Sequence, residues 1–192
     1  MKTTLIFDCY GVISTSVAEV WGRKYFSDEQ FKIITSEIIS KGDIGELTDL
    51  EVYDNLSLLT GVPSEEIRHE WESLAHLRED LLEEIKRLKK KYHIVLLSNA
   101  SRGFLEKSVL NRMNVDDYFN EIIVSSDICL IKPNVDIYTY ALDKINKTAL
   151  ECVFIDDNPK NIEGAKKAHI DGIVFKNTDD FKNELEKLVN KN

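Results

Sequence analysis

The chain has 192 residues, of which 43% are hydrophobic and 31% charged, and its formal net charge is −9. This length and composition describe one globular domain, or one domain with a modest insertion. The acidic charge argues against nucleic acid or an anionic membrane surface as the main partner. Every apolar run is too short to span a bilayer, so a membrane partner is not expected either.

The three cysteines, Cys9, Cys129 and Cys152, lie in apolar sequence surroundings and lack the spacing of metal ligands. We expect all three to be small buried hydrophobic residues in a reducing compartment. An apolar run begins close to the N-terminus, which leaves no room for a signal peptide before Asp8. These features predict a cytoplasmic protein.

Residues Thr3–Phe7 predict a first strand, and no second strand is expected before Tyr92. Between them, apolar residues recur at helical spacing with glycines as breaks. The expected helices are Val17–Tyr25, Asp28–Ser40, Leu47–Leu59 and Pro63–Ala75. This block is too long for an ordinary crossover between strands. We interpret residues 14–76 as a helical cap, and residues 1–13 with 77–192 as the core.

After the cap, helical and strand patterns alternate regularly. The expected strands are His93–Leu97, Glu121–Ser125, Cys152–Ile155 and Gly172–Phe175. The expected helices are Asp80–Lys91, Arg102–Arg112, Asn134–Ile145, Asn158–His169 and Asp179–Asn190. Such alternation is typical of a parallel sheet with helices on both faces. The predicted fold class is therefore α/β, a three-layer parallel sandwich with a helical cap inserted after the first strand.

Polar groups suited to one kind of chemistry follow four apolar segments of the chain. They are Asp8, Ser98 with Asn99, Lys132, and Asp156 with Asp157. The carboxyl ends of parallel strands gather at one edge of a sheet, where ligands bind. We therefore expect these side chains to lie close together.

This set suits phosphoryl transfer. Asp8 is a candidate nucleophile that would form an aspartyl-phosphate. Asp156 and Asp157 offer the hard oxygen ligands that Mg²⁺ prefers. Ser98 offers a hydrogen bond to a phosphoryl oxygen from the start of a helix, and Lys132 offers a positive charge. The chain contains neither GxGxxG nor GxxxxGK[ST], which argues against a dehydrogenase and a P-loop nucleotidase.

The same segments resemble the four ordered motifs of the haloacid dehalogenase-like (HAD) hydrolases. The matching stretches are Asp8 through Val12, Leu97-Ser98-Asn99, Lys132-Pro133 and Phe154 through Asn158, with Gly42-Asp43-Ile44 and Asn161 through Ala165 between and after them. The resemblance covers nearly the whole chain. It is closest to the branch of bacterial α-glucose-1-phosphatase-like proteins and the phosphatase domain of soluble epoxide hydrolases.

The resemblance implies a Rossmann-like core and Mg²⁺-dependent hydrolysis of a small phosphorylated metabolite, with sugar phosphates among the candidates. By position, Asp8 is the implied nucleophile. Ser98 and Asn99 are the implied phosphate contacts, and Lys132 would stabilise the aspartyl intermediate.

The resemblance also implies the ligands of the metal. Asp8 and Asp156 would bind Mg²⁺ through carboxylate oxygens, and Tyr10 would bind it through its backbone carbonyl. Asp157 would assist through a metal-bound water or by orienting Lys132.

The chain departs from the family pattern at Tyr10, where phosphatases usually have a second Asp as general acid and base. The loss of such a group typically costs about 10²–10⁴-fold in rate. One interpretation is a phosphatase for leaving groups that need less help, such as sugar-1-phosphates or acyl phosphates. A phenol with a pKa near ~10 could itself donate the proton.

Two other interpretations of Tyr10 stay open. A 2-haloacid dehalogenase has Tyr at this position, but that branch lacks the paired acid Asp156-Asp157 and has Thr where this chain has Val12. A catalytically impaired binding or regulatory protein is the third. A receiver domain of two-component signalling is disfavoured by the long helical insertion and by the order of Lys132 before Asp156.

The sequence offers little on substrate choice. The aromatic and basic candidates of the cap region are Trp21, Arg23, Tyr25 and Arg78. The expected partner is a small phosphorylated molecule, and the expected state is a monomer or weak homodimer.

Overall fold

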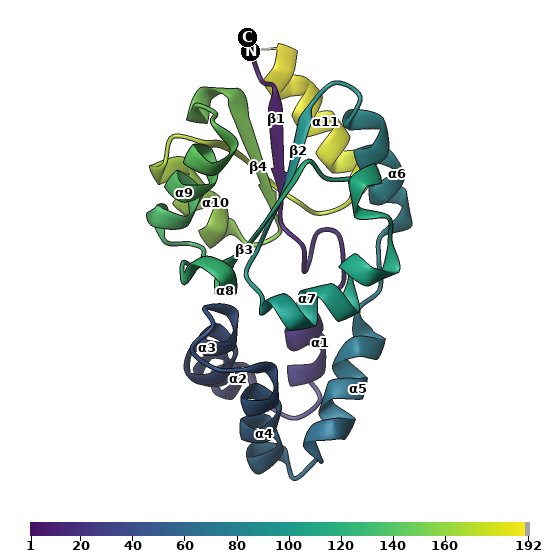
Figure 1. The fold of residues 1–192 in the computed structure, drawn as a ribbon, viewed down its shortest axis with the longest axis vertical. Helices are drawn as coiled ribbons and strands as arrows, with labels where there is room; N and C mark the ends of the chain where they lie inside the picture. Colours follow the sequence, from purple (N-terminus) through teal and green to yellow (C-terminus); the bar gives the residue numbers. More distant parts are fainter. Residues whose placement is uncertain (191–192) are drawn as a thin grey trace.

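The computed structural model describes residues 1–190 of the chain. Its five strands are β1 (Thr4–Phe7), β2 (His93–Ser98), β3 (Glu121–Val124), β4 (Cys152–Asp156) and β5 (Asp171–Val174). They form one parallel sheet in the order β3-β2-β1-β4-β5. The predicted strands and the predicted parallel sheet are confirmed. Figure 1 shows this sheet between helices, with a separate group of helices beyond one end.

Helices cover both faces of the sheet. The helices of the core are α6 (Glu79–Leu88), α7 (Arg102–Ser108), α8 (Ser125–Ile128), α9 (Val135–Ile145), α10 (Pro159–Lys167) and α11 (Thr178–Asn190). Alternate residues of a strand point to opposite faces. Leu5 and Phe7 of β1 therefore pack with α6, α7 and α11, and Ile6 packs with α9 and α10. The predicted three-layer Rossmann-like arrangement is confirmed.

The central strand β1 places the end of the first motif between two others. In the register of the sheet, Phe7 lies beside Leu96 of β2 and Ile155 of β4. The next residue, Asp8, is thus level with the ends of both neighbouring strands. The chain leaves β1 for the cap and returns to the sheet on either side of it, and such a switch point forms a crevice at the carboxyl ends of the strands.

The cap region consists of α1 (Val17–Gly22), α2 (Asp28–Ile34), a π-helical turn (Thr35–Ile39), α3 (Ser40–Asp43), α4 (Asp49–Thr60) and α5 (Ser64–Leu74). These helices form the lower part of Figure 1. They have an apolar cluster of their own around Trp21, Leu56, Ile67 and Trp71, to which Phe104 of α7 is added. The division at residues 13/14 and 76/77 stays a prediction.

Three expectations from the sequence are wrong in detail. The helix expected over Asp28–Ser40 is α2 continued through a π-helical turn into α3, as far as Asp43. The helix expected over Arg102–Arg112 ends at Ser108, because Val109 leaves helical geometry with a φ of −130°. Cys129 is exposed, whereas Cys9 and Cys152 are buried. Cys129 has a φ of 54° and is the left-handed cap at the end of α8.

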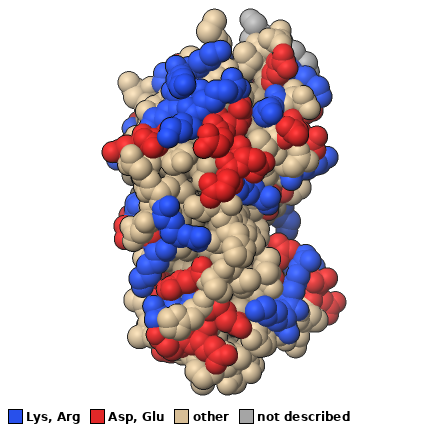
Figure 2. Space-filling model, turned by 90° about the vertical axis from the view of Figure 1, so that its right-hand side faces the viewer, with Lys and Arg blue, Asp and Glu red and all other residues tan. Residues whose placement is uncertain are grey.

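The remaining regular turns are 3₁₀ helices at Leu110–Arg112, Val115–Asp117 and Ala149–Glu151. Within the described residues, no helix combines the length and the apolar character that crossing a membrane requires. On the face drawn in Figure 2, acidic and basic side chains are interspersed over both the core and the cap.

Candidate active site

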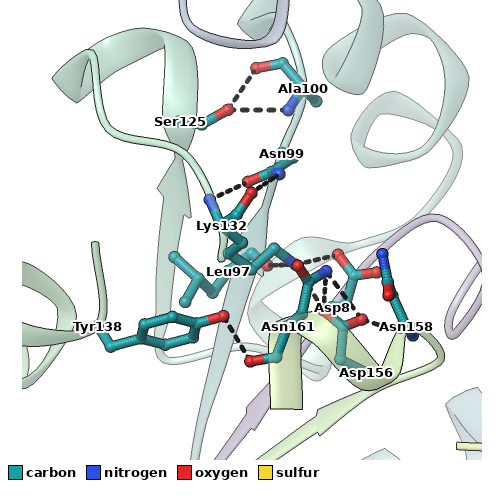
Figure 3. A network of polar contacts seen from close by, with 10 residues as sticks. All are labelled: Asp8, Leu97, Asn99, Ala100, Ser125, Lys132, Tyr138, Asp156, Asn158 and Asn161. Carbon is teal, nitrogen blue, oxygen red and sulfur yellow. Dashed lines mark hydrogen bonds and ion pairs between the residues drawn. The ribbon is translucent and has the colours of Figure 1, made fainter. Parts of the chain in front are cut away.

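Lys132 joins the ends of three strands. Its Nζ donates hydrogen bonds to Oδ1 of Asp8 (2.6 Å), to Oδ2 of Asp156 (2.9 Å) and to the carbonyl of Leu97 (2.9 Å) (Figure 3). Its side chain is only 1% exposed. Burial opposes the charged form, but Asp156 and Asp8 raise the pKa of Lys132 above its ordinary value. The ammonium group is therefore charged and has used all three of its donors.

Asp156 is held in place by the start of α10. The side-chain amide of Asn161 donates to both carboxylate oxygens of Asp156 at 3.0 Å, and the backbone N–H of Asn158 donates to Oδ1 at 2.8 Å. The hydroxyl of Tyr138 on α9 in turn donates to the carbonyl of Asn161 at 2.7 Å. Asn161 and Tyr138 were not among the predicted site residues. Asn161 follows Asp156 by five residues, a spacing that could have indicated it.

Asn99 connects the loop after β2 to the loop that carries Lys132. Its Nδ2 donates to the carbonyl of Lys132 at 3.0 Å, and its Oδ1 accepts from the backbone N–H of Lys132 at 2.9 Å. This paired contact positions Lys132. The phosphate contact expected of Asn99 stays a prediction.

The predicted phosphate ligand Ser98 is fully buried. Within the described residues its hydroxyl has no hydrogen-bond partner. An unpaired buried hydroxyl is costly, so its presence at the end of β2 calls for a partner. A phosphoryl oxygen is one partner of the right kind, and this contact stays a prediction.

Three carboxylates meet beside Lys132. One oxygen each of Asp8, Asp156 and Asp157 lies within 4.8 Å of the others. Burial raises the pKa of Asp8 to about 7, against the opposing charge of Lys132, and raises that of Asp157 to about 6. One ammonium group does not balance three carboxylates. Hard oxygen donors that repel one another in a buried place fit a divalent cation such as Mg²⁺.

Gly11 makes room for the third carboxylate. A Cβ at this position would lie 2.2 Å from Oδ2 of Asp157, far inside van der Waals contact. Gly11 also has a φ of 101°, a conformation that residues with a side chain rarely adopt. A glycine at position 11 is therefore needed for the Asp157 carboxylate to take its place in the acidic cluster.

Tyr10 is tied to α7 through its hydroxyl. Its oxygen lies 2.7 Å from Oγ of Ser108, and Ser108 donates its own hydrogen to the carbonyl of Phe104 at 2.6 Å. A serine has one hydrogen to give, so Tyr10 must be the donor to Ser108. The Tyr10 ring stacks on Phe104 with centroids 5.5 Å apart, and burial raises the pKa of the phenol well above 10.

Two adjoining cavities open next to Asp8. The first, of about 400 Å³, is lined by Asp8, Tyr10, Ser16, Glu19, Asn99, Lys132, Asp157, Asn158, Pro159 and Asn161. The second, of about 240 Å³, lies under the cap and shares Tyr10, Ser16, Glu19 and Asn99 with the first. We call them the catalytic cavity and the cap cavity.

Neither cavity is lined by the four specificity candidates from the sequence, Trp21, Arg23, Tyr25 and Arg78. Trp21 is fully buried in the cap and donates from Nε1 to Glu70. The guanidinium of Arg78 lies 5.6 Å from the ring centre of Phe175 in the core. The cap cavity is built instead by residues such as Phe31, Asp43, Trp71 and Phe104.

Comparison with known proteins places this site in a family. A model of the haloacid dehalogenase-like hydrolases matches residues 2–169. The chain therefore belongs to the HAD-like hydrolases, as the sequence motifs predicted.

Curated relatives are distant. A phosphorylated carbohydrates phosphatase of Thermotoga maritima is 25% identical over 88% of this chain and 82% of its own length. The drimenol cyclase drtB of Aspergillus calidoustus is 23% identical, and the match covers 80% of this chain but only 30% of that protein. The mouse bifunctional epoxide hydrolase 2 is 32% identical over 39% of this chain and 14% of its own length.

Solved structures share the fold at low identity. A HAD family enzyme from Bacteroides thetaiotaomicron, solved with magnesium and inorganic phosphate, has a TM-score of 0.76 at 23% identity and covers 92% of this chain and 95% of its own. A HAD-like hydrolase from Porphyromonas gingivalis has a TM-score of 0.78 at 18% identity, with 98% of both chains covered. The L-2-haloacid dehalogenase of Xanthobacter autotrophicus has a TM-score of 0.65 at 19% identity, with 90% and 76% covered.

Proposed function

We propose that this chain is a Mg²⁺-dependent phosphomonoester hydrolase that acts on a small phosphorylated metabolite through an aspartyl-phosphate on Asp8. The observation that carries the proposal is the position of Asp8 among the residues that line the catalytic cavity. There it contacts Lys132 and lies beside the carboxylates of Asp156 and Asp157. A nucleophile, a fixed cation and a cation-binding acidic pair are the groups that phosphoryl transfer needs.

The reaction has two displacements at phosphorus. A carboxylate oxygen of Asp8 attacks the phosphorus, the bond from phosphorus to the alcohol oxygen breaks, and the departing oxyanion takes a proton from solvent water. A second water molecule then attacks the phosphorus, releases a proton to solvent as the bond to the Asp8 oxygen breaks, and inorganic phosphate departs. Lys132 holds the attacking carboxylate in place and offsets negative charge in both steps.

The metal would be bound by Asp8 and Asp156, by the backbone carbonyl of Tyr10 and, directly or through water, by Asp157. When bound, Mg²⁺ supplies positive charge for the transferring phosphoryl group. Gly11 supports this assignment because it leaves the space that the Asp157 carboxylate occupies.

The charge of the two cavities disfavours the dehalogenase alternative. A 2-haloacid carries a carboxylate that needs a cation in the protein. Of the described residues that line the cavities, Lys132 is the only Lys, Arg or His, and it is engaged by Asp8 and Asp156. The catalytically impaired alternative is disfavoured because the nucleophile, the lysine and the acidic pair are all present.

The class of substrate is inferred from one relative and from the hydrogen bond of Tyr10. Sugar phosphates should be among the first substrates tested, because a relative is named for phosphorylated carbohydrates. Among substrates that bind equally well, those with a good leaving group, such as sugar-1-phosphates and acyl phosphates, should react ahead of ordinary alkyl phosphates, because the phenol of Tyr10 gives its hydrogen to Ser108 and leaves the alcohol oxygen without that donor. We further propose a monomer or weak homodimer that works in the cytoplasm. The three unpaired cysteines support a reducing location.

The test is a panel of phosphorylated metabolites and 2-chloropropionate, each assayed with Mg²⁺ and with EDTA. We expect phosphate release with Mg²⁺ only, and none from the Asp8→Asn protein.

Beryllofluoride with Mg²⁺ should raise the melting temperature of the unchanged protein but not that of Asp8→Asn, because a ligand that binds only the native state stabilises it. Asp143→Asn, an exposed change on α9, is the matched control. Undiminished hydrolysis in EDTA, or a fully active Asp8→Asn protein, would contradict the proposal.

A further inference from the structure

Four of the thirteen residues that line the cap cavity are aromatic, and four more are aliphatic. Rings from four different parts of the chain line it: Tyr10, Phe31, Trp71 and Phe104. Tyr10 stacks on Phe104, and Trp71 meets Phe104 edge to face with centroids 5.6 Å apart. The remaining apolar walls are Val17, Ala18, Ile39 and Ala100. A cavity built in this way binds an apolar body against its rings, and its other lining residues are Ser16, Glu19, Thr35, Asp43 and Asn99.

The charged groups of the cap cavity have one sign. Among its described lining residues are two carboxylates, Glu19 and Asp43, and no Lys, Arg or His. Glu19 is partly neutralised because its carboxylate contacts the exposed Arg23 at 2.5 Å. Asp43 also lines the cavity and forms no ion pair with any described residue, and the charge of Lys132 offsets only part of the effect of its burial. An anionic group placed here would meet repulsion in surroundings that screen it weakly.

Asp43 is fixed between the cap and the core. Its backbone carbonyl accepts a hydrogen bond from the hydroxyl of Ser125, at the start of α8. Two residues later, Gly45 packs so closely on the carbonyl of Ser126 that a Cβ would lie 2.9 Å from it. Burial raises the pKa of Asp43 to about 7, a sign that its charge lacks a full partner. The backbone that carries this carboxyl is thus held in place, and the carboxyl itself can accept a hydrogen bond or a positive charge.

Trp71 adds an unused donor. Its side chain is buried, it lines the cap cavity, and within the described residues its Nε1 has no hydrogen-bond partner. A buried indole N–H usually has one. The orphaned donor is a second observation, independent of charge, that points to a ligand for this cavity.

We propose that the cap cavity binds the alcohol part of the substrate and prefers an apolar alcohol that carries a cationic nitrogen. A neutral apolar alcohol should bind less well, and an anionic alcohol should bind least well. The proposal rests on the phosphomonoesterase function above. Aromatic faces attract a cation, and a neighbouring carboxylate increases the attraction. A second phosphate or a carboxylate on the substrate would find no Lys, Arg or His among the described residues that line the cap cavity.

Three aryl phosphates of nearly equal size test this order. They are O-phosphotyramine, which carries an ammonium group, neutral 4-ethylphenyl phosphate, and 4-(2-carboxyethyl)phenyl phosphate, which carries a carboxylate. Their leaving groups are phenols with a pKa of about 10, so differences in rate report binding rather than leaving-group chemistry. We expect kcat/KM with Mg²⁺ to fall by about tenfold at each step from cation to neutral to anion. The affinities of the inactive Asp8→Asn protein should fall in the same order, so that the dissociation constant rises from cation to neutral to anion.

Asp43→Asn links the selectivity to this residue. It should reduce the advantage of the cation over the neutral compound to less than about threefold and raise kcat/KM for the anion. Glu66→Gln is the matched control, because it removes one exposed acidic charge from the cap outside both cavities and should leave the order intact.

The outcomes separate the two proposals. If none of the three compounds nor any metabolite of the panel is hydrolysed with Mg²⁺, the phosphomonoesterase function is wrong and the selectivity proposal fails with it. If they are hydrolysed but the anion equals the neutral compound, or the cation is not ahead of it, the function stands and the selectivity proposal is overturned. An unchanged order in Asp43→Asn would also overturn the assignment of the cation site.

Discussion

The phenol of Tyr10 donates its hydrogen to Oγ of Ser108 across 2.7 Å, and this bond fixes the role of the residue at which the chain departs from its family. The hydroxyl is bound to α7, and the ring forms a wall of both cavities. We expect the backbone carbonyl of Tyr10 to be its metal ligand. On this proposal Tyr10 contributes its main chain and its ring rather than an acidic proton.

A Tyr10→Phe protein should therefore keep kcat/KM within about threefold of the unchanged protein. Its free energy of unfolding should fall by about 1 kcal/mol, because one buried hydrogen bond is lost. Steady-state assays and urea denaturation check the two effects. A loss of 10²-fold or more in kcat would show that the phenol is the general acid after all.

Lys132→Met should destabilise the protein by about 3–5 kcal/mol, because the carboxylates of Asp8 and Asp156 would stay buried without their cation. Thermal unfolding in EDTA and in Mg²⁺ measures this. Mg²⁺ should raise the melting temperature of the variant more than that of the unchanged protein, since the metal replaces the missing positive charge. Lys144→Met, which removes an exposed lysine 3.8 Å from Glu121, is the control and should unfold almost as before. Equal effects of the two changes would contradict the central role of Lys132.

Gly11→Ala and Gly61→Ala form a matched pair for the metal site. Both glycines have a positive φ, of 101° and 75°, but a Cβ would collide with the Asp157 carboxylate only at Gly11 and has open space at Gly61. Gly61→Ala should cost about 1 kcal/mol of stability from backbone strain alone. Gly11→Ala should cost more and also weaken Mg²⁺ binding, measured by calorimetry. If both variants bound Mg²⁺ as well as the unchanged protein, Asp157 would have no part in the metal site.

Asp43 should make stability depend on pH. Burial raises its pKa from 3.8 to about 7, so between these values the native state holds a proton that the unfolded chain releases. The free energy of unfolding of the unchanged protein, relative to that of Asp43→Asn, should therefore fall as pH rises from about 4 to about 7, and level off above it. We expect a fall of at least about 1 kcal/mol, less than the full shift because solvent reaches the cavity.

Urea denaturation of both proteins in EDTA at pH 4.5, 6 and 8 tests this. A constant difference across the three values would contradict a buried, uncompensated carboxyl at Asp43. Glu66→Gln, which changes an exposed carboxylate, should show no such trend.

The sequence by itself determined the fold class and the gathering of the motifs. Its apolar runs are short and continuous, which is typical of strands buried on both faces, and they alternate with helical patterns. Parallel strands bring their carboxyl ends to one edge, so Asp8, Asp156 and Lys132 could be placed together before any coordinate was known.

Only the tertiary structure decided how the side chains are used. Phe31, Trp71 and Phe104 look like apolar positions of amphipathic helices, and nothing in their local sequence tells a cavity wall from a packed core. The exposure of Cys129 depends on a left-handed residue after α8, which apolar neighbours in the sequence do not predict. Contacts such as Tyr10 with Ser108 join residues 98 positions apart. Local spacing reports the period of a helix or strand, whereas these contacts depend on how whole elements are packed against one another.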